Sequence, residues 1–443
     1  MKSVIVFVII SSSYIQLTVA SGCNDCLLLT PHIKAGNISL AKKLSEVDSA
    51  EYFGIQSYSG FITVKEQYNS NLFFWYFPLV GRTFETPWII WLQGGPGVSS
   101  MMGLFEIIGP LKIVDGKVQR RSVTWATNYS MLFIDNPVGA GYSFTEDDRG
   151  YPDNEDDIGA QLLKFLLQFL QMFPDMRLAP LFIVGQSYAG KYVPALGIQI
   201  HRFNHKKFDQ KINLRGIAIG NGLIELRNMM HYSDFCRDLG LLDGNQLGRL
   251  KMMEEDVVEL IDNKLFVEAA NKFNETIEYI KKTSGVSVYN FMKDPTRDAP
   301  PFEAYINSDD VRRLIHVGDA EFDYNNQHVY NKMLPDVANS TRPFVEELLE
   351  HYGVLSYSGQ LDIILPYALA KHMYATLNWS HRQDYDKAVR RRLRRHANGA
   401  VVGYKKSGGN FVEVLIRGAG HSVPVDQPDV AMFIIDTFIS DYT

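Results

Sequence analysis

The chain has 443 residues, of which 46% are hydrophobic and 21% are charged, as is usual for a globular protein with a large core. Its formal net charge of −6 at pH 7 argues against nucleic acid as a partner, because proteins that bind nucleic acid present an excess of basic side chains. The length would allow two or three average domains, but single α/β domains also reach this size.

The first twenty residues have the features of a signal peptide. Lys2 precedes an apolar run from Val4 to Ile10, and Thr18 and Ala20 are small residues at the −3 and −1 positions of a cut after residue 20. Serines interrupt the run, which is shorter than the ~20 apolar residues that a membrane span needs, and no later segment is long enough. We therefore expect a secreted or lysosomal/vesicular protein without a membrane span.

Glycosylation motifs agree with the secretory pathway. The five Asn-x-Ser/Thr sequons are at Asn37, Asn128, Asn274, Asn339 and Asn378. Asn128 directly precedes an apolar run, so we expect burial to limit its modification. There are three cysteines, so at least one is unpaired or pairs between chains. Cys23 and Cys26 are expected to form a local disulfide or to have no function.

Short apolar runs alternate with helical patterns along the chain, which predicts a mostly parallel sheet with helices on both faces. Helices are expected at about 156–173, from about 190, and from 428. From about 226 to 300 the sequence is charged and helix-rich, without clear strands. The expected strands are 72–77, 87–92, 131–135, 181–185, 216–220, 354–358 and 411–416.

The segment 185–190 has the pattern of a nucleophile elbow, in which a strand turns sharply into a helix. Gly185 and Ala189 are small enough for that turn, which would project the Ser187 hydroxyl at the edge of the sheet. Such pentapeptides are common in loops, but the predicted strand before this one and the helix after it favour a functional site. The sequence thus predicts an α/β-hydrolase fold over residues 21–443, interrupted by a helical cap at about 226–300.

A serine hydroxyl becomes a good nucleophile when a base takes its proton and a third group orients that base. In this fold the order along the chain is serine, acid, histidine. Asp362 lies in a turn directly after the strand expected at 354–358, and His421 lies just after 411–416. The ten other histidines lack this combination of order and context. We therefore predict a catalytic triad of Ser187, Asp362 and His421.

The glycine-rich run 91–97 follows a predicted strand. Glycines let a backbone approach the substrate closely and present N–H groups to it, as an oxyanion hole requires. The expected donors are the N–H groups of Gly95 and of Tyr188, the residue after the nucleophile. A phosphate-binding loop is the rival interpretation, but the run lacks Gly-Lys-Ser/Thr and contains Pro96. No cofactor and no metal are expected.

Several motifs in one order resemble the serine carboxypeptidase family. They are the segments 91–100, 135–144, 187–194, 216–222 and 420–424. Segments 29–36 and 68–75 resemble its vitellogenic carboxypeptidase-like branch in particular. The similarity extends from about residue 27 to the C-terminus and is weakest at 226–300. It implies removal of single C-terminal residues from peptides by the predicted triad, usually at acidic pH.

The resemblance also implies a clamp for the terminal carboxylate of the substrate, which the family builds from two glutamates and an asparagine. Gln186 stands in the place of the first glutamate and Ile107 in that of the second, with Glu106 offset by one residue. Gln93 stands in the place of the asparagine, as in the vitellogenic branch. We expect Gln93, Gly94 and Gln186 to contact the substrate.

Two further positions depart from the family pattern, since Ser422 replaces a bulky apolar residue and Val98 a frequent cysteine. The first hypothesis is a serine carboxypeptidase that acts on peptides through an acyl-enzyme on Ser187. The alternative is an esterase or acyltransferase that uses the same triad on a small acyl substrate. A catalytically idle binding protein is more distant, because such proteins usually lose a triad member.

The densest charge run in the chain is 390–395, with five arginines and one leucine. A solvated helix face is the favoured interpretation. The segment 392–395 also fits the dibasic pattern that secretory processing proteases cut, and exposed basic segments are readily nicked. A cut there would place Asp362 and His421 on different chains.

Overall fold

The computed structural model describes residues 23–295 and 300–443, so the predicted signal peptide lies outside the described residues. Its main feature is an eleven-stranded sheet, accompanied by a separate two-stranded hairpin. The strands are β1 (Glu46–Val47), β2 (Ser57–Lys65), β3 (Ser70–Phe77), β4 (Trp88–Leu92), β5 (Leu111–Val114), β6 (Lys117–Arg120), β7 (Ser130–Ile134), β8 (Leu181–Gln186), β9 (Leu214–Gly220), β10 (Gly353–Gly359), β11 (Arg391–Leu393), β12 (Gly403–Gly408) and β13 (Phe411–Ile416).

The strand order is β1-β2-β3-β7-β4-β8-β9-β10-β13-β12-β11. The six strands from β7 to β13 in this order are parallel, and the strands outside them pair antiparallel. The carboxyl ends of the parallel strands meet at one edge, where open α/β sheets place their ligands. Strands β8, β9, β10 and β13 therefore deliver the segments that follow them to one place.

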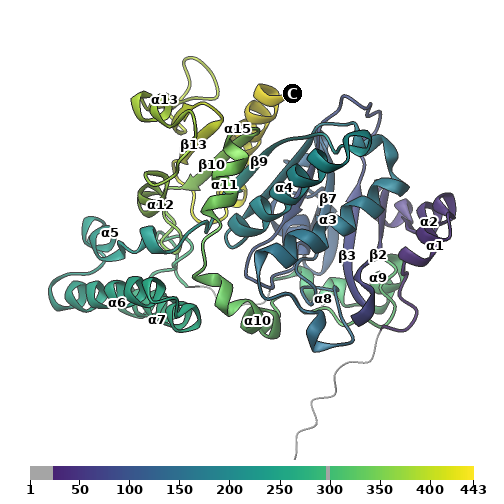
Figure 1. Ribbon diagram of the computed structural model, residues 1–443, viewed down its shortest axis with the longest axis horizontal. Coiled ribbons are helices and arrows are strands. Elements are labelled where there is room, and N and C mark those ends of the chain that lie inside the picture. The colour runs from purple at the N-terminus through teal and green to yellow at the C-terminus, as the bar shows by residue number, and fades with distance from the viewer. Residues whose placement is uncertain (1–22, 296–299) are drawn as a thin grey trace, which may run out of the picture.

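Helices cover both faces of the sheet, and α3, α4 and α11 lie on the face turned toward the viewer in Figure 1. The helices are α1 (Thr30–Lys34), α2 (Ile38–Leu44), α3 (Glu155–Met172), α4 (Ala189–Lys206), α5 (Tyr232–Asp238), α6 (Gly244–Asp262), α7 (Phe266–Ser284), α8 (Phe302–Ile306), α9 (Asp309–Leu314), α10 (Gln327–Val337), α11 (Arg342–Leu349), α12 (Tyr367–Tyr374), α13 (Arg382–Lys387), α14 (Val423–Asp426) and α15 (Pro428–Tyr442).

Strand β3 shows how the sequence builds two cores. Its residues alternate between faces, so that Leu72, Phe74 and Tyr76 join the cluster under α3 and α4. Phe73 and Trp75 join the opposite cluster with α8 and α15. All its side chains are apolar from Leu72 to Phe77 because both faces of a central strand are buried. This arrangement fixes the register of the sheet and hence the position of its carboxyl edge.

All seven predicted strands are present, with ends within two residues of those expected, and the helices predicted at 156–173, 190 and 428 are α3, α4 and α15. Strand β2 was missed because its serines, glycine and threonine hide the apolar pattern. The helix favoured for the arginine run was wrong: Arg391–Leu393 form edge strand β11, paired antiparallel with β12. Asn128 is exposed, so the burial expected for it was wrong too, because it ends a surface turn before β7.

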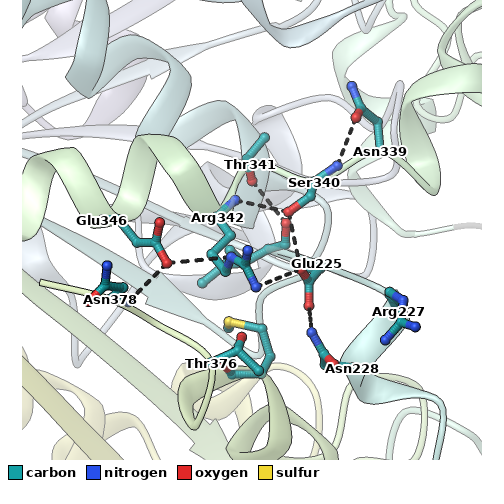
Figure 2. A network of polar contacts seen from close by, with 12 residues as sticks. Glu225, Arg227, Asn228, Asn339, Ser340, Thr341, Arg342, Glu346, Thr376 and Asn378 are labelled. Atoms are coloured by element: carbon teal, nitrogen blue, oxygen red, sulfur yellow. Dashed lines mark hydrogen bonds and ion pairs between the residues drawn. The ribbon is translucent and has the colours of Figure 1, made fainter. Parts of the chain in front are cut away.

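Between β9 and residue 295 the described chain contains helices α5, α6 and α7, which pack on one another to one side of the sheet (Figure 1). Where this segment leaves the sheet, the buried carboxylate of Glu225 contacts Arg342 Nη1 at 3.5 Å and accepts a hydrogen bond from Asn228 (Figure 2). Arg227 also pairs with Asp262 of α6 at 2.6 Å. This polar network anchors the start of the helical insertion to α11.

Cys23 and Cys26 form a disulfide, as one of the two expected alternatives states. Cys236 is a free, buried thiol, and burial raises its pKa to about 12. No helix among the described residues is both long enough and apolar enough to cross a membrane.

Candidate active site

Ser187 occupies the turn between β8 and α4 with a φ of 63°, a left-handed conformation that is uncommon for a residue other than glycine. Neighbouring backbone holds the turn: Ser187 N donates to Gly220 O at 3.0 Å, and Leu223 N donates to Ser187 O at 3.0 Å. A Cβ on Gly185 would lie 2.6 Å from Leu92 O, so that position requires glycine. The sharp turn expected from the sequence is thus present, and Ser187 lines a pocket.

His421 and Asp362 come together at the same edge of the sheet. His421 Nδ1 lies 2.9 Å from Asp362 Oδ2, and both side chains are buried. The other carboxylate oxygen accepts a hydrogen bond from Ile364 N at 3.0 Å. The parallel pairing of β10 with β13 brings the loops that carry Asp362 and His421 side by side.

The sequence did not indicate a role for Asn221, which follows β9. Its Nδ2 donates to Asp362 Oδ2 at 2.7 Å, and its Oδ1 accepts from Gly359 N at 3.1 Å. Asn221 therefore fixes the same carboxylate oxygen that the histidine contacts. The sequence did contain a signal for a site residue here, because Asn221 directly follows a predicted parallel strand. Asp362 and His421 also lie shortly after such strands.

The segment after α7 is bound to both of these loops. Tyr289 O accepts a hydrogen bond from His421 N at 2.7 Å, and Val288 O accepts from Ile363 N at 2.9 Å. Asp426 of α14 reinforces the junction, since it accepts from Gly420 N at 2.8 Å and contacts Lys293 Nζ at 2.6 Å. The helical insertion is therefore attached to the histidine and acid loops.

The glycine-rich loop lies against the serine turn. A Cβ on Gly94 would lie 2.5 Å from Tyr188 N, so the two backbones are in direct contact. Gly95 has a φ of 119° and lines the same pocket as Ser187 and Tyr188. The structure thus brings Gly95 and Tyr188, the expected donors of an oxyanion hole, to the serine.

Asp135 holds the segment that directly follows the glycine-rich loop. It is fully buried and accepts hydrogen bonds from Ser99 Oγ at 2.5 Å, Ser100 N at 2.9 Å and Tyr142 N at 3.0 Å. Burial raises the pKa of its carboxyl to about 7, although the same hydrogen bonds act in the opposite direction. Asp135 joins the segments 99–100 and 142, which the sequence showed only as family-like motifs.

A buried ion pair lies behind Tyr188. Lys191 Nζ contacts Asp336 Oδ2 at 2.9 Å with both side chains almost fully buried, and Tyr188 Oη donates to the same oxygen at 2.7 Å. Asp336 belongs to α10, so this pair joins α10 to the start of α4. It fixes the side chain of Tyr188, a residue that lines the pocket at Ser187.

Of the residues expected at the carboxylate clamp, Gln93 and Gln186 lie at the carboxyl ends of neighbouring strands, whereas Ile107 lies in an apolar cluster. Gln93 and Gln186 follow Leu92 and Gly185, which are paired in register between β4 and β8. Ser422 Oγ donates to Gln186 Oε1 at 3.3 Å. Ile107 is buried in the apolar cluster, so it offers no polar group.

Glu106, the acid offset by one residue from the expected position, is half-buried in a π-helical turn, Gly103–Ile107. Burial raises the pKa of its carboxyl, and the nearby Arg121 opposes this rise. Its Oε1 has no hydrogen-bond partner within the described residues.

A pocket of about 370 Å³ opens at Ser187 between the sheet edge and α7. Its walls are mostly apolar, and two charged residues of α7, Glu278 and Lys281, form an ion pair of 3.2 Å within its lining. The principal apolar lining residues are Leu223, Phe273, Ile277, Val337, Ile364 and Leu365. A side chain bound here would lie next to the serine hydroxyl.

The profile of the serine carboxypeptidase family matches residues 48–441. The chain is a member of that family. Like the venom serine carboxypeptidase of Apis mellifera, with which it is 39% identical over 424 residues (93% of this chain, 90% of the relative), it is a serine-type carboxypeptidase. Vitellogenic carboxypeptidase of Aedes aegypti is 39% identical over 428 residues, covering 93% of this chain and 89% of the relative.

The human protein named probable serine carboxypeptidase CPVL is also 39% identical over 427 residues, with 93% of this chain and 89% of the relative covered. The expected resemblance to this family and its vitellogenic branch is therefore confirmed. Among solved structures, the prohormone-processing carboxypeptidase Kex1 of Saccharomyces cerevisiae superposes with a TM-score of 0.80 at 23% identity, covering 90% of this chain and 96% of that one. This similarity confirms the α/β-hydrolase fold of the serine carboxypeptidase.

Proposed function

We propose that Ser187, His421 and Asp362 form the catalytic triad of this carboxypeptidase. The observation that carries the proposal is the 2.9 Å contact between His421 and Asp362 at the sheet edge where the strained Ser187 turn also lies. In this assignment Asp362 holds the imidazole in one orientation, and His421 takes the proton of the Ser187 hydroxyl.

The reaction then proceeds in two steps. Ser187 Oγ attacks the carbonyl carbon of the last peptide bond, and His421 passes the hydroxyl proton to the leaving amine as that bond breaks. Water then gives a proton to His421 and attacks the acyl-enzyme, which releases the shortened peptide acid and restores Ser187. The N–H groups of Gly95 and Tyr188 stabilise the negative oxygen that forms in each step.

We assign the apolar pocket to the side chain on the acyl side of the cleaved bond. Its walls of aliphatic and aromatic groups next to Ser187 support this assignment and favour a large apolar residue there. Helix α7 supplies Phe273 and Ile277 to the walls, so the helical insertion at about 226–300 acts as a cap that shapes the substrate site. Gln93, Gly94 and Gln186 take the opposite side, where the terminal carboxylate binds.

The altered clamp keeps an esterase or acyltransferase as the second candidate, because neither reaction needs a bound carboxylate. Assays of a blocked dipeptide, its C-terminal amide and a simple ester separate the candidates, with Ser187→Ala as the control for each. Carboxypeptidase function predicts turnover of the dipeptide acid that Ser187→Ala abolishes. Turnover of the ester alone would identify the second candidate, and no turnover of any substrate would identify an idle protein.

We also propose that the protein enters the secretory pathway and acts outside the cell or in an acidic vesicle. Four of the five sequon asparagines, all except Asn274, are exposed. Asn274 is half-buried, lines the pocket and hydrogen-bonds Tyr330 Oη at 2.7 Å, so a glycan there would fill the substrate site. Glycosidase treatment should shift the protein's mobility, and mass spectrometry should find Asn274 unmodified.

A further inference from the structure

A second pocket lies at the edge of the sheet opposite to Ser187. It has a volume of about 430 Å³, and its lining includes Leu178, which precedes β8, and Leu214, the first residue of β9. Because β8 and β9 are parallel, these residues lie at the amino ends of the strands, whereas Ser187 follows the carboxyl end of β8. The proposed peptidase reaction involves none of the residues that line this pocket.

Side-chain hydrogen bonds to the backbone join the three segments that meet at this pocket. Asn204, in the last turn of α4, donates to Ile212 O and accepts from Ile212 N, both at 2.8 Å. Asn213 Nδ2 donates to Leu178 O at 2.7 Å. The end of α4, the segment before β8 and the segment before β9 are therefore fixed relative to one another, so the pocket has fixed walls.

The lining of the pocket is basic. It includes Arg177, His205 and Lys211, and no residue of the described chain that lines it carries a carboxylate. The acid nearest to Arg177 in the sequence, Asp175, contacts Arg82 at 3.8 Å. A cavity lined by one sign of charge concentrates ions of the opposite sign. The pocket therefore favours an anion.

Arg177 is half-buried, and its guanidinium has two nitrogens that the protein does not use. Nη1 donates to Gln210 O at 2.6 Å, and this bond orients the guanidinium plane. Nε and Nη2 donate to no acceptor within residues 23–295 and 300–443, and neither atom is sealed from solvent. Burial lowers the pKa of the guanidinium, because the charged form loses hydration. An anion bound at these two nitrogens would offset that loss.

His205 supplies a second polar group to the same pocket. It is exposed in the last turn of α4, and its ring packs against that of His201 with the ring centroids 4.5 Å apart. His201 Nδ1 lies 3.1 Å from Tyr352 Oη, and Tyr352 also lines the pocket. These contacts orient the His205 imidazole, which has an N–H group for an anion. Lys211, from the segment before β9, adds a further positive charge.

We propose that this pocket binds the phosphate or sulfate group of a small organic monoester, with Arg177 as the main contact and His205 and Lys211 as further contacts. The Nε and Nη2 groups of an arginine form a planar fork that matches two oxygens of a tetrahedral oxyanion. Ile212 and Leu214 give the pocket an apolar wall for the organic group, and its volume is in the range of small-molecule sites. The inference goes beyond the proposed function and does not depend on it.

Titration calorimetry of the intact protein with phenyl phosphate, at physiological ionic strength, is expected to show saturable binding at one site. Arg177→Gln should weaken this binding about tenfold or more, because it removes hydrogen bonds between charged groups. Hydrolysis of a blocked dipeptide should be unchanged in this variant, because the pocket and Ser187 lie at opposite ends of β8.

Arg215→Gln is the matched control, because it removes the same charge from an exposed arginine that follows Leu214 but does not line the pocket. Its affinity should stay within about twofold of that of wild type, since salt screens a separate exposed charge. His205→Gln provides a second pocket variant if Arg177→Gln does not fold, and should weaken binding several-fold. A wild type without saturable binding, or equal affinity in the pocket variant and Arg215→Gln, overturns the inference.

Such a phosphate group comes from a soluble monoester or from a phospholipid headgroup. Leu178 is 65% exposed and lines the pocket, so an apolar side chain for a bilayer lies beside the basic groups. Sedimentation with phosphatidylcholine vesicles, with and without phosphatidic acid, separates the two sources. Binding to the phosphatidic acid vesicles that Arg177→Gln removes would identify a lipid headgroup, whereas binding of phenyl phosphate without vesicle binding would identify a soluble monoester.

Discussion

Asn221 donates a hydrogen bond to the same oxygen of Asp362 that His421 contacts, at 2.7 Å against 2.9 Å for the histidine. The asparagine has a φ of 40° and is fully buried, so its backbone and its carboxamide are both fixed. Asp362 is thus oriented by a residue that directly follows the neighbouring strand β9. This arrangement makes Asn221 a positioning residue for the histidine.

Replacing Asn221 with glycine should lower kcat by about tenfold to a hundredfold, the cost of losing one hydrogen bond to a charged group. Glycine accepts the positive φ, so the backbone need not change. KM should change little, because Asn221 is not among the residues that line the pocket at Ser187. Steady-state kinetics on a blocked dipeptide measure both constants, and an unchanged kcat would show that Asp362 is held without Asn221.

Much of the fold follows from local pattern. Strand β13, Phe411–Ile416, was predicted with both ends correct, because a continuous apolar run between polar residues has few other interpretations. Strand β11 could not be predicted, since three exposed residues rich in arginine become a strand only through pairing with β12. Tertiary pairing overrides local propensity there.

The candidate site likewise contains residues that local pattern predicts and residues that it does not. Ser187, Asp362 and His421 were predicted as a triad because each follows a predicted strand and chain order limits the choice. The contact between Gln186 and Ser422 spans 236 positions, so the sequence shows both residues only as separate oddities. Asp336 was missed because nothing in its helix indicates that its carboxylate meets Lys191.

If the carboxamides of Gln93 and Gln186 bind the terminal carboxylate of the substrate, the pH dependence of KM should differ from that of a clamp built from acids. Carboxamides do not titrate between pH 4 and 8, so KM for a blocked dipeptide should stay nearly constant over that range. Gln186→Glu with Ile107→Glu should restore an acid-biased profile, since the ionised pair repels the substrate carboxylate.

Steady-state kinetics from pH 4 to 8 on wild type and the double variant provide the comparison. A wild-type KM that rises steeply toward neutral pH would contradict the carboxamide clamp. Glu106, whose pKa is raised by burial, would then be the acid that binds the carboxylate.

Stability should also depend on pH, through Glu155. Its carboxyl is fully buried, and this burial raises its pKa well above the usual range. The negative charge of the nearby Asp336 adds to the rise, whereas Lys191 opposes it. The folded protein therefore keeps a proton that the unfolded chain releases above about pH 4.3, so the free energy of unfolding falls as pH rises above that value. Glu155→Gln, which has the shape of the protonated form, should raise Tm relative to wild type more at pH 7.5 than at pH 5.

Glu225→Gln is the matched control for that measurement, because Glu225 is also buried but pairs with Arg342. It should lower Tm at pH 7.5, since a buried ion pair that loses one charge is strongly destabilised. Equal Tm shifts for Glu155→Gln at both pH values would mean that Glu155 does not hold its proton in the folded state.

The loop after β11 should be the first place where a protease specific for dibasic sites cuts the folded protein. Arg395 and His396 are exposed and lie outside regular structure, so the segment is open to cleavage. A cut after Arg395 separates Asp362 from His421, but β10 and β13 remain paired at six positions. Denaturing gels should show two fragments, gel filtration one species, and the peptidase assay retained activity; dissociation of the fragments would contradict this prediction.

Covalent labelling tests most directly whether Ser187 is the nucleophile of a working triad. A fluorophosphonate probe reacts covalently with an activated serine hydroxyl and needs no knowledge of the natural substrate. Wild type should label at one site, with peptide mapping to Ser187, whereas Ser187→Ala should not label and His421→Ala should label only weakly, because the triad acts as a unit. A wild type that does not react, or equal labelling after Ser187→Ala, would show that Ser187 is not the nucleophile.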